Sequence, residues 1–279
     1  MQHHAGRRCG AAAACRVRRG GRVSTVLPRP GAWSASLVFA TRALLKLKHR
    51  PEQLIDVTIF PVIMTLMFTY LLGSTLAASP ADYLQFLLPG VLVMSVVMIT
   101  PNTGVGINVD VEKGLFDRIR TLAVWRPSAL VGALLGDLVR YVLASTVILV
   151  VGLVLGFRPP GGVLGVLAGV VLVLVFAFAF SWIWTLAGLV LRTQKSVMSV
   201  SVLVLFPFTF LSNVFVEPKN PPAWLRMFMR FDPIAHLVTA VRGLMRGVWN
   251  GPEIGWTLLS AVLLLAVFGT LSMWRYNRR

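Results

Sequence analysis

Long apolar stretches separated by short polar segments dominate the chain from residue 54 onwards. A helix needs about 20 consecutive apolar residues to cross the hydrocarbon core of a bilayer, and six stretches have that length. Two prolines followed by two glycines at 159–162 predict a turn between the third and fourth stretch. The pattern therefore predicts an all-α, polytopic membrane protein with six transmembrane helices, at about residues 54–77, 84–107, 130–156, 163–191, 197–216 and 254–274.

A first segment outside these stretches, residues 33–50, has the spacing of an amphipathic helix. Trp33 and several leucines recur on one face, while Arg42, Lys46 and Arg50 occupy the other. This arrangement is typical of a helix that lies in the cytoplasmic membrane interface, with its basic side chains towards anionic lipid. The same stripe would also suit a cytosolic helix packed on a partner.

A second segment, residues 217–252, is too charged to span a membrane and too apolar for a plain loop. The Pro pair at 221–222 and Asp232-Pro233 divide it into two short helices, Ala223 to Arg230 and Ile234 to Arg246. We expect both helices to dip into the outer leaflet over the outer mouth of the bundle, with Trp224 and Phe228 buried against the spans. A hairpin lying on the membrane surface is the alternative.

Composition agrees with a membrane protein. Hydrophobic residues make up 56% of the chain and charged residues 13%, and the mean hydropathy is +0.77, whereas soluble domains carry about 25% charged residues. The net charge of +17 comes from basic residues that flank the apolar stretches. They are not interleaved with aromatic residues on one surface, so we do not expect nucleic-acid binding.

The distribution of Lys and Arg predicts the orientation. With the N-terminus in the cytoplasm, twenty of the 27 basic residues lie on the cytoplasmic side and six on the outer side. Cytoplasmic loops carry the excess of Lys and Arg in membrane proteins. We therefore expect a multi-pass protein of the plasma membrane with both termini in the cytoplasm.

Residues 1–31 contain seven arginines and no acidic residue, and they lack a usable apolar periodicity. Such a segment cannot bury enough surface to order itself, so we expect a disordered basic extension ahead of one transmembrane domain at 32–279. A mis-assigned translation start is equally compatible, and no cleavable signal peptide is visible. The spacing of Cys9 and Cys15 is not that of a metal site, even with His3 and His4 nearby.

Sequence motifs for catalysis and nucleotide binding are missing. The chain has no GxxxxGK[ST], HExxH, GxSxG or EF-hand pattern, and its four histidines are scattered. We therefore expect no enzyme activity and no cofactor or metal bound by this chain.

The segment from Glu112 to Leu122 is charged and lies between two apolar stretches, so it must lie outside the hydrocarbon, where a soluble partner could push on it. Its apolar residues form one helical stripe, Leu115, Ile119 and Leu122, and its charged residues project elsewhere, Lys113, Asp117, Arg118 and Arg120. Asp110 or Glu112 would favour the positive N-terminal end of this helix. An inert loop in the membrane plane is the alternative.

Asp137 and Arg140 lie inside the third apolar stretch at i, i+3 spacing. A charge at membrane depth costs at least about 2.5–3.5 kcal/mol on insertion scales, so such residues pair or face protein. Mutual neutralisation and a contact with the charged segment or a partner are both open.

Three groups of residues in this order resemble the type-2 ABC exporter permeases, most closely the daunorubicin-resistance-type drug-efflux branch. They are Val111 to Arg120, then Phe210 to Val216 with Pro221 to Leu225, and finally Phe231 to Leu237 with Ala240 to Leu244. The resemblance covers about residues 33–279. The sequence departs from it at Asp232, where the family more often has Asn before the Pro.

The resemblance implies a pair of such permeases, from a second copy or a paralogue, with twelve spans and two cytosolic ABC ATPase subunits that bind ATP and Mg. Residues 33–50 would be the connecting helix and 112–124 the coupling helix that docks into the ATPase. Residues 221–247 would be the external re-entrant helices, which include Trp224, Phe228, Asp232, Pro233 and Arg242. A hydrophobic or amphipathic substrate, drug-like or lipid-linked, would leave the cell.

Other functions are open at this point. The permease could export a polysaccharide or glycolipid instead, because the sequence shows an apolar pathway without a selective polar filter. A membrane-embedded enzyme has little support, since apart from Asp137 no predicted span carries the paired acids or histidines that such chemistry needs. A channel without an ATPase is the remaining class.

Overall fold

The computed structural model describes residues 51–76, 79–114, 128–214 and 222–278, and every regular element within these ranges is a helix. This confirms the all-α part of the predicted fold class. The predicted basic extension 1–31 and interfacial helix 33–50 lie outside the described residues. The helices are α2 (Pro51–Leu76), α3 (Pro80–Ile99), α4 (Pro101–Glu112), α6 (Ser128–Val154), α7 (Gly162–Val190), α8 (Gln194–Phe210), α9 (Ala223–Phe231), α10 (Pro233–Met245), α11 (Gly251–Leu264), the π-helical turn η1 (Leu265–Gly269) and α12 (Thr270–Arg278).

Four helices in the described residues are long and apolar enough to cross a membrane, at 81–112, 130–154, 162–190 and 251–276. They correspond to the second, third, fourth and sixth predicted stretches. Shorter apolar helices occupy 61–71, within α2, and 194–210, which is α8. Many large apolar side chains on the outer faces of α6, α7, α8 and α11 are exposed, which suits contact with lipid. The chain is therefore a multi-pass membrane protein.

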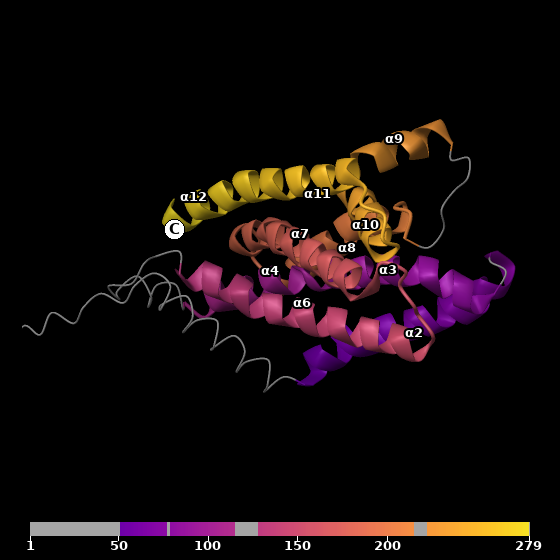
Figure 1. The fold of residues 1–279 in the computed structure, drawn as a ribbon. Coiled ribbons are helices and arrows are strands. Elements are labelled where there is room, and N and C mark those ends of the chain that lie inside the picture. The colour runs from indigo at the N-terminus through magenta and orange to yellow at the C-terminus, as the bar shows by residue number, and fades with distance from the viewer. Residues whose placement is uncertain (1–50, 77–78, 115–127, 215–221, 279) are drawn as a thin grey trace, which may run out of the picture.

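The long helices run between two ends of a bundle (Figure 1). At one end, near the C-terminus, the side chain of Gln194 at the start of α8 donates to Glu112 at the end of α4. At the opposite end, α10 lies beside the turn between α6 and α7, where the Gly161 N–H donates to the Met245 carbonyl over 2.9 Å, and α9 precedes α10 at the same end. The short helices therefore gather at the end that is distant from the C-terminus.

The second predicted span is divided between α3 and α4 at Thr100-Pro101. Proline has no N–H for the helical bond to the carbonyl four residues earlier, which here is that of Val97. The Thr100 N–H and hydroxyl donate to this carbonyl instead, over 3.1 and 2.6 Å. The break is thus satisfied locally, and the two helices continue in one direction.

Helix α4 continues as far as Glu112, beyond the predicted end of the second span. Asp110 and Glu112 accordingly lie in its last turn, where the helix dipole is negative. The charged helix that was expected to begin near these acids lies beyond Gly114, outside the described residues. Both acids continue the second span, because nothing between 107 and 112 breaks its helix.

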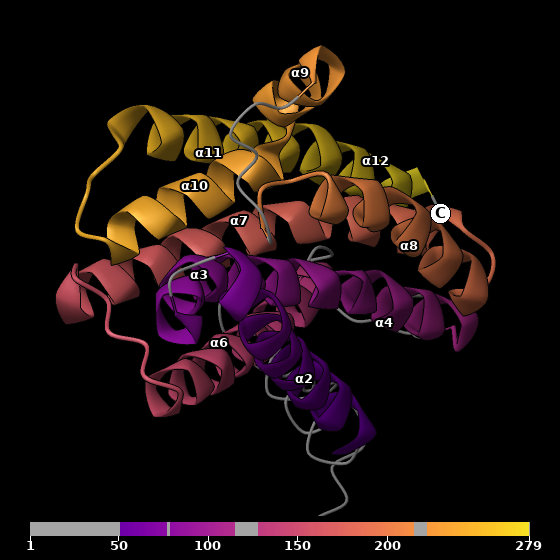
Figure 2. The same cartoon turned by 90° about the vertical axis from the view of Figure 1, so that its right-hand side faces the viewer.

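Helix α7 lies at the centre of the bundle, in contact with α3, α4, α6, α8, α10, α11, η1 and α12. Figure 2 shows it between α4 and α6 on one side and α10 and α11 on the other. Its buried face includes Phe176, Phe180 and Trp184, whose rings contact one another in sequence along the helix. These aromatic side chains fill the core around which the other helices pack.

Two glycines allow α7 and α4 to approach closely. A Cβ atom on Gly104 would collide with the backbone carbonyl of Trp184, and one on Gly188 would collide with the carbonyl of Gly104. Small residues let membrane helices bring their backbones together where van der Waals contact provides most of the association energy. These glycines therefore set the distance between α4 and α7.

Candidate functional site

The structure describes only the beginning of the predicted coupling segment. Glu112 ends α4, and its carboxylate accepts a hydrogen bond of 3.1 Å from the Gln194 amide of α8. Lys113 caps the helix through a backbone bond to Val109, and Gly114 follows with a φ of 62°. The remaining predicted coupling residues lie outside the described residues: Leu115, Asp117, Arg118, Ile119, Arg120 and Leu122.

An apolar cluster lies at the same end of the bundle as Glu112. Ile107 of α4, Leu130 of α6, Leu189 of α7 and Tyr276 of α12 are buried together. Asn108 adds a polar connection, since its amide donates to the carbonyls of Gly188 and Leu191 over 3.2 and 2.8 Å. The end of α4 is thus joined to α6, α7 and α12.

At the other end, the predicted pair of short helices is confirmed to within one residue of its bounds. Asp232 lies between α9 and α10 and caps α10, since its carboxylate accepts from the Ile234 N–H over 2.9 Å. Pro233 takes the first helical position, where a missing N–H costs nothing. The sequence signal Asp-Pro therefore determines the junction.

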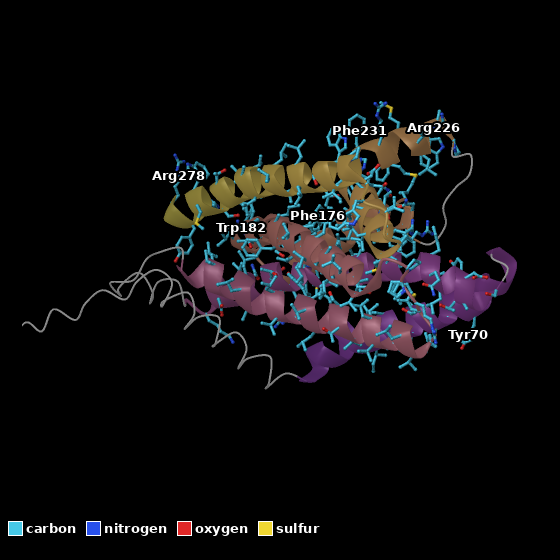
Figure 3. All side chains as sticks on the ribbon, viewed as in Figure 1. Tyr70, Phe176, Trp182, Arg226, Phe231 and Arg278 are labelled. Carbon is cyan, nitrogen blue, oxygen red and sulfur yellow. The ribbon has the colours of Figure 1, made fainter. Side chains whose placement is uncertain are left out.

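Helix α9 has one face on the bundle and one face that is exposed. Phe228 of α9 packs on Phe208 of α8 with ring centroids 5.5 Å apart, as expected for a residue near the spans. Trp224 is 64% exposed, so the expectation that it is buried against the spans is wrong for this chain. Figure 3 shows Arg226 and Phe231 projecting from α9, whereas Phe176 and Trp182 lie within the bundle. Helix α9 rests on the bundle by one face only, and none of its residues is fully buried.

Asp232 is an unusual capping residue because its side chain is 1% exposed. Burial raises the pKa of this carboxyl to about 7, although hydrogen bonds from the Ile234 and Ala235 N–H groups and the charge of His236 lower it. Its second oxygen, Oδ2, has no hydrogen-bond partner among the described residues. Asn would cap the helix without this electrostatic cost.

Arg242 of α10 is buried, with 5% of its surface exposed. Its guanidinium donates to the backbone carbonyls of Phe86, Asn213 and Val214 over 3.2, 3.1 and 3.5 Å. It also lies 3.7 Å from the centre of the Phe86 ring, which is a cation–π geometry. Arg242 therefore joins α10 to α3 and to the residues that follow α8.

Asp137 and Arg140 form an ion pair on α6, with Arg140 Nη1 2.9 Å from Asp137 Oδ1. Their side chains are 11% and 15% exposed, respectively. The i, i+3 spacing brings the two groups onto one helix face, as the sequence predicted. A role in contact with a partner stays a prediction.

A chain of hydroxyl groups in the core was not anticipated from the sequence. Tyr141 of α6 is within 3.2 Å of the Thr103 hydroxyl of α4 and 2.8 Å of the Ser181 hydroxyl of α7. Because the Ser181 hydroxyl donates to the Ala177 carbonyl over 2.6 Å, it accepts from Tyr141, and Tyr141 in turn accepts from Thr103. This one-way chain satisfies three buried hydroxyls and joins three spans. Isolated Thr, Tyr and Ser residues inside apolar stretches were the available signal.

Comparisons with known proteins give a consistent result. The profile of the family described as ABC-2 type transporter matches residues 35–246. The chain is 43% identical over 251 residues to the daunorubicin resistance ABC transporter permease protein DrrB1 of Streptomyces coeruleorubidus. The aligned residues cover 90% of this chain and 89% of that protein. It is 28% identical over 244 residues to the probable doxorubicin resistance ABC transporter permease protein DrrC of Mycobacterium tuberculosis, strains CDC 1551 / Oshkosh and ATCC 25618 / H37Rv, covering 82% of this chain and 87% of each relative.

Proposed function

The chain belongs to the ABC-2 type transporter family, and on this basis we propose that it is the permease subunit of an ATP-driven exporter that moves a hydrophobic or amphipathic compound out of the cell. The observation that carries the proposal is the 43% identity over 90% of the chain to a permease named for daunorubicin resistance. A drug-like compound is the favoured cargo, since the second relative is named for doxorubicin resistance. A lipid-linked molecule, glycolipid or polysaccharide is the alternative cargo.

The proposed topology has six spans with both termini in the cytoplasm. Helices α2 and α8 join the four long helices as spans. The 26 residues of α2 rise about 39 Å and the 17 residues of α8 about 25 Å, against a hydrocarbon core of about 30 Å. The positive charge balance of the loops supports this orientation. An impermeant thiol reagent applied outside should label a single cysteine at Lys219 and not one at Arg120.

At the outer end, α9 and α10 would act as external re-entrant helices. Arg242 is the observation in their favour, because its three carbonyl contacts join α10 to the bundle while its side chain is shielded from solvent. Irregular backbone is tolerated near the membrane when it is buried in protein. The pair would close the outer end of the export pathway, while the exposed side of α9 would face lipid headgroups.

At the inner end, the segment from Glu112 to Leu122 would dock into a cytosolic ABC ATPase, which would bind the ATP and Mg. This chain would bind no cofactor or metal itself. The contacts of Glu112 with α8 and of Asn108 with α7 support this role, since they would carry a displacement into the spans. Two permeases, as two copies or as paralogues, would form the complete pathway within the lipid bilayer, with no nucleic acid involved.

The experiment that tests this function is co-purification of the tagged permease with a cassette ATPase from its native membrane. Ile119→Asp should abolish the association and export while leaving membrane insertion and dimerisation intact, because loss of an apolar anchor that is an interface hot spot commonly costs more than about 1 kcal/mol of binding. Arg118→Glu should weaken the complex in a salt-dependent way. Arg278→Glu is the matched control, since this exposed charge lies on α12. Full ATPase association and export by Ile119→Asp would refute the coupling role.

A further inference from the structure

His236 in the first turn of α10 contacts two different helices through its two ring nitrogens. Nδ1 lies 2.6 Å from Oε2 of Glu253, in the first turn of α11. Nε2 lies 2.9 Å from the backbone carbonyl oxygen of Arg230, in the last turn of α9. The ring thus connects the three helices at the end of the bundle distant from the C-terminus.

Both atoms that face the ring are hydrogen-bond acceptors in their ordinary states. A carbonyl oxygen never donates, and an ionised carboxylate accepts only. A neutral imidazole has a single N–H, so with an ionised Glu253 it would leave one of the two contacts without a proton. Either the ring is an imidazolium, or Glu253 is protonated and donates to Nδ1. Both forms contain the same number of protons, one more than a neutral ring beside a carboxylate.

We propose that His236, Glu253 and the Arg230 carbonyl form a proton-binding site that fastens α9 to α10 and α11 when it is occupied. Loss of the proton leaves an acceptor facing an acceptor at one of the two contacts. The contact to Arg230 is the vulnerable one, because α9 has no fully buried residue and only a few attachments to the bundle. The inference goes beyond the proposed transport function and does not depend on which compartment supplies the proton.

The charges around the ring favour occupation near neutral pH. Burial lowers the pKa of His236. The hydrogen bonds to the Arg230 carbonyl and Glu253, together with the charges of Glu253 and Asp232, raise it by more, so the pKa lies above the ordinary value of 6.5. Helix α7, which packs against α10, contributes no ionisable side chain. The other ionisable residues of the described elements around α10 are Asp82 and Tyr83 on α3, Arg226 and Arg230 on α9, and Arg242 on α10 itself, while Glu217 and Lys219 lie outside the described residues.

The pKa shifts give the direction of the effect. Because the pKa of His236 is raised in the folded protein, its contribution to stability is complete below about pH 6.5 and is lost as the pH rises through the folded value. Asp232 acts in the same direction at lower pH, since its buried carboxyl has a pKa of about 7 and resists ionisation. The junction of α9, α10 and α11 should therefore loosen as the solution becomes alkaline.

A spin label on α9 tests the proposal directly. Met227 is 67% exposed, so Met227→Cys can be labelled in a background in which Cys9 and Cys15 are replaced by Ser. In nanodiscs, which expose both membrane faces to one buffer, the mobile fraction of the nitroxide should rise between about pH 6.5 and pH 9. A label at Leu263→Cys on α11, also exposed, serves as the control and should not respond to pH.

Variants assign the titration to the site. His236→Gln has no titrating ring, so its label should show a pH-independent and raised mobile fraction. Glu253→Gln should move the midpoint to lower pH, because the carboxylate is one of the groups that raise the pKa of His236. Asp232→Asn should keep a titration, which separates the site from the neighbouring buried acid. A label mobility that is constant across this range in the wild-type background, or a titration that persists in His236→Gln, would overturn the proposal.

A second readout requires no label. The Trp256 ring stacks on His236 with centroids 6.0 Å apart and an interplanar angle of 17°. An imidazolium quenches indole fluorescence more strongly than a neutral imidazole does. The fluorescence difference between the wild type and Trp256→Phe should therefore increase with pH, at the midpoint found with the spin label. An unchanged difference would also count against the proposal.

Discussion

Arg242→Met should strongly destabilise the outer end of the bundle. The substitution keeps an apolar stem of similar length but removes the guanidinium that donates to the carbonyls of Phe86, Asn213 and Val214. Those acceptors lose a charged donor in a place where the arginine is almost fully buried. Helix α10 would then keep its apolar contacts and the hydrogen bond from the Asn213 amide to the Thr239 hydroxyl, but it would lose the charged donor that joins it to α3 and to the residues after α8.

The magnitude follows from opposing contributions. A hydrogen bond to a charged group contributes about 1.5–3 kcal/mol, and two of the three distances are 3.2 Å or shorter. A desolvated cation–π contact adds about 2 kcal/mol, and the ring of Phe86 is 3.7 Å away. Removing the charge also removes its desolvation cost, which is several kcal/mol. We therefore expect Arg242→Met to reduce the free energy of unfolding by about 2–4 kcal/mol.

Equilibrium unfolding with SDS in mixed micelles, followed by far-UV circular dichroism, measures this change. Arg242→Lys should recover only part of the loss, because an ammonium lacks the planar fork that reaches several carbonyls at once. Arg246→Met is the matched control and should lie within about 0.5 kcal/mol of the wild type, since Arg246 is exposed. A free energy of unfolding for Arg242→Met equal to that of Arg246→Met would refute the reasoning.

Three further changes test other parts of the structure. Asp232→Asn keeps the cap but removes a carboxyl whose pKa is about 7 in the folded protein. The stability advantage of this variant over the wild type should therefore grow between about pH 4 and pH 7 and stay constant above. Thermal unfolding at pH 4 and pH 8 measures the advantage, and an equal value at both would contradict the burial argument. Tyr141→Phe interrupts the hydroxyl chain and should lower the free energy of unfolding by about 0.5–1.5 kcal/mol. Unchanged stability in the same assay would mean that Thr103 and Ser181 find other partners. Gly188→Leu places a side chain against the Gly104 carbonyl and should abolish monodisperse elution on size-exclusion chromatography, whereas Gly255→Leu, where nothing lies within 4 Å of an added Cβ, should be tolerated.

Local composition was sufficient for the all-helical character of the fold and for most helix bounds to within a few residues. A run of about 20 apolar residues has to satisfy its backbone groups internally within a bilayer, so it forms a helix wherever it packs. Turn residues act locally too, which is why Pro159 to Gly162 and Asp232-Pro233 predicted the ends of α6, α7, α9 and α10. The family could be inferred from short groups of residues for the same reason, because their order along the chain is visible without the fold.

Two expectations from the sequence differ from the structure, namely where the second span ends and whether Trp224 is buried. Charged residues after 108 suggested a separate segment, but Asp110 and Glu112 continue α4, because no helix-breaking residue lies between 108 and Gly114. Trp224 was expected against the spans, since an amphipathic stripe indicates that one face is covered. Trp224 and Phe228 are four residues apart and share one face of α9, but only Phe228 packs on α8, whereas Trp224 in the first turn is exposed. The pattern indicates which face is covered, but it does not say how far along the helix the cover extends.

Only the tertiary structure decided which polar residues meet. Arg242 looks like an ordinary charge on the polar side of an amphipathic helix, yet its partners come from residues 29 and 156 positions away. Tyr141 meets Thr103 and Ser181 across separations of 38 and 40 residues, and His236 meets Glu253 across 17. Periodicity describes one helix at a time, whereas these contacts depend on the rotation, depth and crossing of several helices together. Those variables are determined by packing, in which glycines such as Gly104 and Gly188 matter only once both helices are in place.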